Sequence, residues 1–162
     1  DLLFACAKYP GNDPEFLREL RLEISAALRQ RAHHPAIVLW CGNNEIEWGD
    51  WDWGYAQSAP AHPHYALFHL EIPRLLRAEV PAPIHWISSP WSPDGLTPNS
   101  PVAGDQHPWA VSIGRPGAAD WWLYRGYVDR LPNEGGVLGA STPATLRQSL
   151  HNFLSRSIDK DH

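Results

Sequence analysis

Short apolar runs alternate with amphipathic segments along the chain. The runs at residues 2–7, 37–40 and 84–89 each end at turn-forming or polar residues, and this pattern predicts three short strands. The run at 37–40 is not interrupted by polar residues, so we expect it to be buried on both faces. Strands of that kind normally lie in a parallel sheet with helices packed around it.

Between these runs, apolar residues recur at helical spacing. The first helix is expected to begin after the N-cap residue Asp13 and to end near residues 33–35. A second helix is expected at about 65–79, where Pro73 predicts a kink or a division into two short helices. The last part of the chain, from Pro143 to Ile158, predicts a third helix.

The second half of the chain is less regular. Residues 90–120 are rich in Pro, Gly, Ser and Asp, although Val111 and Ile113 allow a short strand there. Residues 130–136 then place Glu134 after a short apolar run. The alternation of strands and helices predicts an α/β fold with a parallel sheet.

Composition narrows the class of protein. A chain of 162 residues is long enough for one domain with its own core, and its net charge of −5 argues against nucleic-acid binding. The chain has no run of about 18 apolar residues, so no membrane span is predicted. Nine Trp residues favour a binding cleft for sugar or aromatic rings. The sequence leaves the cellular compartment open.

Cys6 and Cys41 lie in apolar runs and are expected to be buried free thiols, with a disulfide or metal pair as the alternative.

Two carboxylates follow asparagines at predicted strand ends. Glu45 comes after Asn43 and Asn44, and Glu134 comes after Asn133 and before two glycines. Ligands of α/β proteins bind at the carboxyl edge of a parallel sheet, so both acids are expected there. Two carboxylates on one edge can serve as acid/base and nucleophile on an acetal. Taken alone, either residue is more often an exposed loop acid.

Aromatic and polar residues near these acids are candidates for sugar binding. The cluster Trp48, Trp51 and Trp53 follows Glu45 and predicts either a stacking wall or packing under a loop. Asp105, His107 and Trp109 form a second cluster, which predicts sugar-hydroxyl ligands or a loop held by its own hydrogen bonds. Neither cluster has the spacing of a metal site, so no metal and no organic cofactor is expected.

Three strings of residues together resemble one family. They are Asp1–Ala7, the string His34-Pro35 to Asn44-Glu45, and Gly104-Asp105-x-His107-x-Trp109. The chain resembles the catalytic (β/α)₈ barrel of glycoside hydrolase family 2, most closely its β-mannosidase branch, from residue 1 to about residue 155. The resemblance implies a partial TIM barrel that holds about strands three to seven.

The resemblance also implies roles for residues. Glu45 matches the acid/base at the end of barrel strand four, and Glu134 matches the nucleophile at the end of strand seven. Asn44 matches the residue that contacts the hydroxyl at C2 of the sugar. The predicted carbohydrate-binding residues are Asn43, Asn44, Trp51, Trp53, Trp91, Asp105, His107, Trp109 and Asn133.

The implied reaction is a double displacement that retains the anomeric configuration. It requires carboxyl groups about 5–5.5 Å apart. The segment around the nucleophile departs from the β-mannosidase branch, which usually has Ser-Glu-Phe/Tyr-Gly where this chain has Asn133-Glu134-Gly135-Gly136. The role of Glu134 is kept, but the departure leaves specificity for mannose open.

A complete barrel takes about 250 residues. Residues 1–162 are therefore expected to form a single partial catalytic domain, whose partners are a β-glycoside and the remainder of the same enzyme. A partial barrel exposes sheet edges, so we expect the isolated chain to be marginally stable, aggregation-prone or inactive. The alternatives are a non-catalytic carbohydrate-binding or interaction module and a Trp-rich structural domain.

Overall fold

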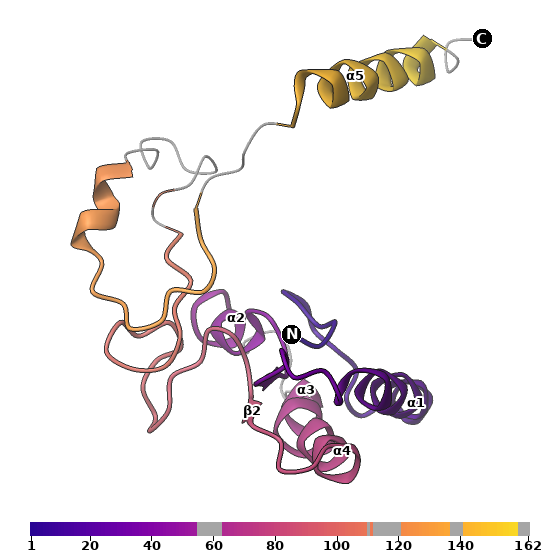
Figure 1. Cartoon of the computed structure of the whole chain (residues 1–162), viewed down its shortest axis with the longest axis vertical. Coiled ribbons are helices and arrows are strands. Elements are labelled where there is room, and N and C mark those ends of the chain that lie inside the picture. Colours follow the sequence, from indigo (N-terminus) through magenta and orange to yellow (C-terminus); the bar gives the residue numbers. More distant parts are fainter. Residues whose placement is uncertain (55–62, 110, 112–120, 137–140, 159–162) are drawn as a thin grey trace.

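The computed structural model describes residues 1–54, 63–109, 111, 121–136 and 141–158 (Figure 1). The described residues form two strands, four α-helices and one π-helical turn before residue 80, one 3₁₀ helix and a late α-helix. In chain order they are α1 (Pro14–Arg31), β1 (Trp40–Cys41), α2 (Ile46–Asp52), α3 (Pro63–Ala66), the π-helical turn η2 (Leu67–Glu71), α4 (Ile72–Glu79), β2 (His85–Trp86), the 3₁₀ helix η3 (Trp121–Gly126) and α5 (Pro143–Ile158). The strand predicted at residues 2–7 is reduced to a single bridge at Ala5.

Parallel pairing organises the centre of the molecule. β1 and β2 are parallel, with Trp40 opposite His85. Single parallel bridges extend this pairing on both sides, since Asn44 bridges both Ala5 and Ser89. A separate parallel bridge joins Gln106 to Pro132. The predicted α/β class with parallel strands is confirmed, but the regular strands are much shorter than the apolar runs.

The expectation that residues 37–40 form a strand buried on both faces is wrong. Val38 is 75% exposed and Leu39 is 42% exposed. The N–H of Ile37 donates to the carbonyl of His34 in the turn after α1, and sheet pairing begins only where Trp40 donates to Ile84. The apolar run is therefore divided between a turn and a strand.

Helix α1 agrees closely with the sequence pattern. Asp13 caps it, because its Oδ1 accepts from the N–H groups of Glu15 (2.8 Å) and Phe16 (3.0 Å), and Pro14 occupies the first turn. One face is buried in the hydrophobic core. The core comprises Leu20, Ile24, Leu28, Ile46, Leu67, Phe68, Ile72, Leu75, Leu76 and Val80.

The second predicted helix is divided, as Pro73 suggested. The π-helical turn η2 separates α3 from α4, and Pro73 lies in the first turn of α4. Proline has no N–H to donate, so a helix that reaches it must change its hydrogen-bonding pattern. Ion pairs from Arg21 to Glu71 (2.5 Å) and from Arg29 to Glu79 (2.6 Å) join this segment to α1. Helices α1 and α4 lie side by side (Figure 1).

Two elements stand apart from this pattern. Helix α2 was not expected, because aromatic and acidic residues at 46–53 obscure its helical spacing. Helix α5 has the predicted bounds and lies away from the rest of the chain in Figure 1, with its residues up to Leu150 exposed. Val111 is buried outside any strand, and Ile113 lies outside the described residues. None of the described helices has the length and apolar character needed to span a membrane.

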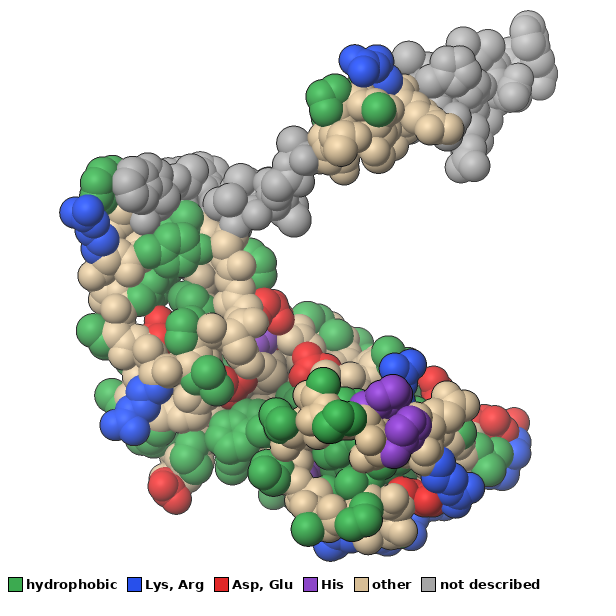
Figure 2. Space-filling model, in the orientation of Figure 1, with side chains coloured by type: hydrophobic (Ala, Val, Ile, Leu, Met, Phe, Trp, Pro, Cys, Tyr) green, Lys and Arg blue, Asp and Glu red, His purple; other side chains and the backbone are tan. Residues whose placement is uncertain are grey.

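Hydrophobic side chains also reach the surface of the face shown in Figure 2. Exposed apolar side chains in the part of the chain that the structure describes include Leu3 (87%), Val128 (78%) and Ile84 (62%).

Candidate active site

Glu45 lies where the parallel pairing ends and α2 begins. Its N–H donates to the carbonyl of Ser89 (2.7 Å), which fixes the backbone against the neighbouring segment. Its φ of 61° and ψ of 18° are left-handed, a conformation that is uncommon for residues with a side chain. Although Glu45 is the N-cap residue of α2, its carboxylate makes no capping bond and points away from the helix. Only 7% of the residue is exposed.

Asn43 supports this turn and has no surface from which to contact a sugar. It is 0% exposed, and its Oδ1 accepts from the Ser88 hydroxyl (2.6 Å) and the Ile46 N–H (3.1 Å). Its amide donates to the carbonyl of Ile87 (3.2 Å). The prediction that Asn43 binds substrate is corrected, because the residue is fully buried and its amide group bonds to other parts of the protein.

Glu134 lies at the end of the segment that pairs with residue 106. The indole of Trp109 donates to its Oε1 (3.2 Å), and its side chain is 36% exposed. The following residue, Gly135, has a φ of 155°, and a Cβ atom there would lie 2.9 Å from the Pro108 carbonyl oxygen. Glycine therefore allows the close backbone contact that the paired glycines suggested.

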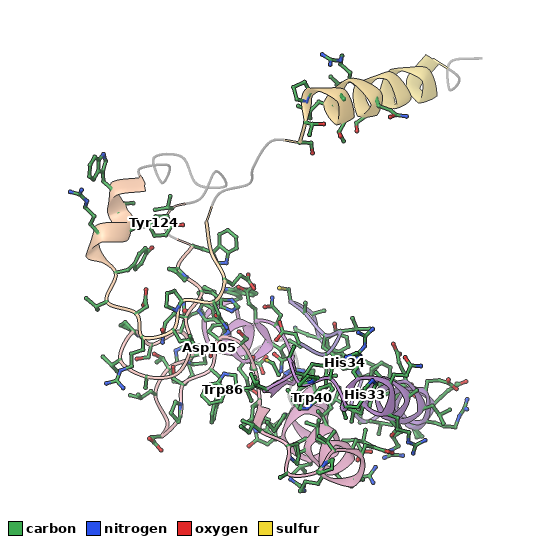
Figure 3. All side chains as sticks on the ribbon, in the orientation of Figure 1. His33, His34, Trp40, Trp86, Asp105 and Tyr124 are labelled. Atoms are coloured by element: carbon green, nitrogen blue, oxygen red, sulfur yellow. The ribbon has the colours of Figure 1, made fainter. Side chains whose placement is uncertain are left out.

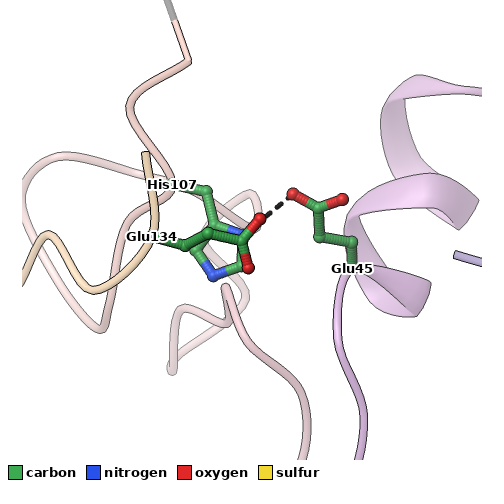
Figure 4. A group of neighbouring side chains, drawn as sticks. All are labelled: Glu45, His107 and Glu134. Carbon is green, nitrogen blue, oxygen red and sulfur yellow. Dashed lines mark hydrogen bonds and ion pairs between the residues drawn. The ribbon is translucent and has the colours of Figure 1, made fainter. Parts of the chain in front are cut away.

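The two carboxylates meet beside one histidine. His107 Nδ1 lies 2.9 Å from Glu45 Oε1 and 3.6 Å from Glu134 Oε2. One oxygen of each carboxylate and this ring nitrogen all lie within 4.8 Å of one another. The carboxylates point toward each other with the imidazole beside them (Figure 4). Residues far apart in the sequence thus form one compact, partly buried group.

Hydrogen bonding fixes the orientation of the His107 ring. Its Nε2 lies 2.9 Å from Ser89 Oγ, and that hydroxyl donates to Asp105 Oδ2 (2.6 Å). A hydroxyl has one proton, so Ser89 can only accept from the ring, and Nε2 must carry a hydrogen. Nδ1 then faces Glu45 either as a second donor or as an acceptor from a protonated carboxyl group. In both cases a proton lies between Glu45 and His107.

Asp105 organises the loop behind His107. It is 2% exposed, and its Oδ1 accepts from the Trp86 indole and the Trp91 N–H, both at 2.8 Å. Its Oδ2 accepts from Ser89 and from the Asn133 amide (2.8 Å). These four bonds use the carboxylate fully, so the expectation that Asp105 contacts sugar hydroxyls is corrected to a supporting role (Figure 3).

Cys6 is an unexpected neighbour of the carboxylates. It is exposed, which corrects the expectation of a buried thiol, whereas Cys41 is buried and both are free. The Cys6 thiol donates to Glu45 Oε2 (3.2 Å), and its sulfur accepts from the Asn44 amide at 3.7 Å. Partial desolvation, followed by the hydrogen bond to Glu45 and the charge of Glu45, raises the pKa of Cys6 to about 11. The thiol is therefore protonated at neutral pH.

The aromatic residues divide into two groups. Trp48 packs edge-on to His107, with ring centroids 6.3 Å apart, and Trp53 lies against Trp48 at 5.3 Å. Trp48 was part of the predicted cluster but not of the predicted site. Trp51 is 61% exposed, and its binding role stays a prediction. Trp91 packs edge-on to Trp86 at 4.9 Å, so it supports the loop around Asp105.

An open pocket of about 740 Å³ lies next to Glu134. Trp109 and Asn133 from the predicted site line it, together with Tyr124 and Tyr127, which sequence reasoning missed. Tyr124 extends from η3 toward this region (Figure 3). The aromatic-rich stretch at residues 121–127 was the available signal for this wall. The pocket joins the carboxylate group to a surface suited to a sugar ring.

The fold and the site define a segment of an α/β protein with a carboxylate pair at the ends of its parallel strands. No family model matches the chain. It is 34% identical over 122 residues to β-mannosidase B of Emericella nidulans and 31% identical over 121 residues to β-mannosidase B of Aspergillus fumigatus. Each alignment covers 68% of this chain but only 14% of the relative.

A solved structure supports the same relationship. The β-D-mannosidase of Dictyoglomus thermophilum matches 91% of this chain with a TM-score of 0.76 and 30% identity. The match covers 17% of that protein. The resemblance to β-mannosidases that the sequence motifs predict is therefore confirmed for this chain, which spans about a seventh of the length of these relatives.

Proposed function

We propose that this chain carries the catalytic carboxylates of a retaining glycoside hydrolase that acts on β-mannosides. Glu134 is the nucleophile and Glu45 is the acid/base. The observation that carries the proposal is a distance: one oxygen of Glu45 lies within 4.8 Å of one oxygen of Glu134. The chain that holds this pair is related to β-mannosidases. Retaining enzymes need carboxyl groups about 5–5.5 Å apart, whereas inverting enzymes need more room for water.

In the first step, the ionised carboxylate of Glu134 attacks the anomeric carbon and displaces the leaving oxygen. Glu45 donates a proton to that oxygen as the bond breaks. In the second step, Glu45 takes a proton from water, and the water attacks the anomeric carbon and releases Glu134. The Trp109 indole, 3.2 Å from Glu134 Oε1, holds the nucleophile in place. Asn44, next to Glu45, is available to the hydroxyl at C2 of the sugar.

The contrasting environments of the two acids support this division of roles. Glu45 is 7% exposed and shares a proton with His107, which suits a group that must begin the reaction protonated. The Glu134 side chain is 36% exposed and accepts a hydrogen bond from an indole, which suits an ionised nucleophile. A proton held between Glu45 and His107 is available to the leaving group.

We infer that the parallel segments belong to a (β/α)₈ barrel, of which this chain holds about strands three to seven. The bridges that join residues 5, 44 and 89, and separately residues 106 and 132, support this order. The exposed apolar side chains at these segments would then be covered by the rest of the enzyme. Residues 1–162 form one partial catalytic domain, and the carbohydrate and the missing part of the enzyme are its partners.

The two-carboxylate mechanism applies to many glycosides. The choice of a β-mannoside as substrate rests on the names of the relatives. Gly135 stands where the β-mannosidase branch has an aromatic residue, but Tyr124 and Tyr127 line the pocket beside it. These rings can replace the missing aromatic surface next to the nucleophile.

A hydrolysis assay with aryl β-mannosides tests the proposal directly. Wild type is compared with Glu134→Gln in the longer enzyme of which this segment is proposed to be part, and aryl β-glucosides and α-mannosides serve as substrate controls. We expect release of the aryl group from the β-mannoside only, and loss of that release in the variant. Saturable sugar binding with no turnover, unchanged in Glu134→Gln, would favour a binding module instead.

A further inference from the structure

We propose that Glu45, His107 and Glu134 form a binding site for a zinc ion. The proposed hydrolysis needs no metal, although it uses the same two carboxylates. One ligand atom from each of the three side chains lies within 4.8 Å of the others, so small side-chain movements close the group around a single ion.

The distances suit zinc. Bonds from Zn²⁺ to nitrogen and oxygen are about 2.0–2.2 Å, which places neighbouring ligands of a tetrahedral site roughly 3.3–3.6 Å apart. The observed separations from His107 Nδ1 are 2.9 Å to Glu45 Oε1 and 3.6 Å to Glu134 Oε2. The oxygens of Glu45 and Glu134 lie within 4.8 Å of each other, so a movement of about 1 Å brings all three atoms into range.

The ring of His107 is already oriented as a metal ligand. A histidine that binds zinc usually donates its other ring N–H to a hydrogen-bonded partner, which fixes the tautomer. Here Nε2 lies 2.9 Å from Ser89 Oγ, which itself donates to the buried carboxylate of Asp105. Because Ser89 can only accept from the ring, a zinc ion that displaces the proton between Glu45 and His107 finds the Nδ1 lone pair directed at it.

The surroundings supply charge. Once the proton between Glu45 and His107 is displaced, two carboxylates give the site a formal charge of −2, which offsets the charge of a divalent ion. Three protein ligands with an open fourth position match known zinc geometries. Glu134 faces the open pocket, so an ion has a route to the site.

If the proposed function holds, bound zinc inhibits it, because the ion occupies both the nucleophile and the acid/base. Zinc binding itself does not depend on that function. Failure of the hydrolysis proposal and failure of the zinc proposal are therefore distinguishable, since binding is measured without substrate.

The test is calorimetric titration of zinc chloride into the full chain, compared with Glu134→Gln, Glu45→Gln and Ser89→Ala. His33→Ala is the control for zinc held at the exposed histidine pair, where the His33 and His34 rings lie 4.3 Å apart. We expect one bound ion, at least tenfold weaker binding in both glutamine variants, and 10–100-fold weaker binding in Ser89→Ala through loss of the ring's partner. The control variant should bind as wild type does.

Cobalt substitution gives an independent readout. We expect the absorption bands of tetrahedral Co²⁺ in the visible region, lost in Glu134→Gln. The proposal is overturned if zinc binding is absent, or if it is unchanged in both glutamine variants and lost in His33→Ala. An octahedral cobalt spectrum would likewise contradict the tetrahedral site.

Discussion

His107 Nδ1 lies 2.9 Å from Glu45 Oε1, and this contact joins the end of the first parallel pairing to the loop that leads toward Glu134. Both side chains are nearly inaccessible, at 1% and 9% exposure. A buried carboxylate and imidazole at this distance must share a proton, because the other ring nitrogen is committed to Ser89. The contact therefore keeps a proton at the position where the proposed reaction uses one.

Glu45→Gln removes the proposed acid/base without changing the shape of the site. We expect kcat for an unactivated β-mannoside to fall about 10²–10⁴-fold, because general acid catalysis contributes that much. An aryl mannoside with a highly acidic phenol should lose less in the first step, since its leaving group needs no proton. Equal losses for both leaving groups would contradict the role given to Glu45.

Ser89→Ala tests the orientation of His107, and Ser92→Ala is its matched control. Both serines are buried, but Ser89 contacts His107 and Asp105, whereas the Ser92 hydroxyl donates to the Ala103 carbonyl (3.1 Å). We expect each variant to lose about 1–3 kcal/mol of stability through an unpaired buried group. Only Ser89→Ala should also lower kcat and shift the pH profile of kcat. The same kinetic change in both variants would mean that general destabilisation is responsible.

Alkylation of Cys6 reports on its contact with Glu45 without any assay of turnover. The pKa of Cys6, raised to about 11 by desolvation and then by Glu45, keeps the reactive thiolate scarce. We expect Glu45→Gln to speed iodoacetamide labelling of Cys6 about 3- to 10-fold at pH 8, because removing the carboxylate lowers the thiol pKa. Glu134→Gln should have a smaller effect, since Glu134 is the weakest of the causes that raise this pKa. Peptide mapping separates Cys6 from the buried Cys41.

Glu71 links α1 to α4 and makes stability depend on pH. Hydrogen bonding to Arg74, then to Arg21 and their charges, outweighs burial and lowers its pKa from 4.5 to about 2. A lowered pKa stabilises the folded state above pH 4.5, and that contribution is lost as the pH falls toward 2. We expect Glu71→Gln to lower the free energy of unfolding by about 1–2 kcal/mol at pH 7, since the partner arginines are half exposed.

Denaturant unfolding at pH 7 and pH 3 measures this effect. The difference in free energy of unfolding between wild type and Glu71→Gln should shrink at pH 3. At that pH Glu71 is protonated in the unfolded chain but still ionised in the folded chain, so proton binding favours unfolding of the wild type. Glu23→Gln, on the exposed face of α1, is the matched control and should change stability little at either pH. A constant difference at both pH values would argue against the ion pairs as its cause.

The positions of the two glutamates could be predicted because parallel strands bring their carboxyl ends to one edge. Whether a polar side chain at that edge faces a ligand or the interior could not be predicted in the same way. Asn43 and Asp105 are buried because Ser88, Trp86 and Trp91 happen to present donors to them, and these partners are distant in the sequence. Only the folded chain shows such pairings.

Helices were more predictable where local chemistry determines them. The cap at Asp13 and the break at Pro73 depend on neighbouring residues, and both are found. Helix α2 was missed, so the sequence could not show that Trp48 would contact His107 while Trp51 would be exposed. The exposure of Val38 was also missed, because burial of an apolar run depends on the elements available to cover it.

The most direct test of the central claim is covalent trapping with 2-deoxy-2-fluoro-β-mannosyl fluoride, followed by mass spectrometry of peptides. Fluoride leaves without a proton, and the fluorine at C2 slows hydrolysis of the glycosyl-enzyme. We predict one sugar per chain on Glu134, still formed in Glu45→Gln and absent in Glu134→Gln. A sugar attached to another carboxylate, or hydrolysis of the β-mannoside by Glu134→Gln at the wild-type rate, would contradict the account.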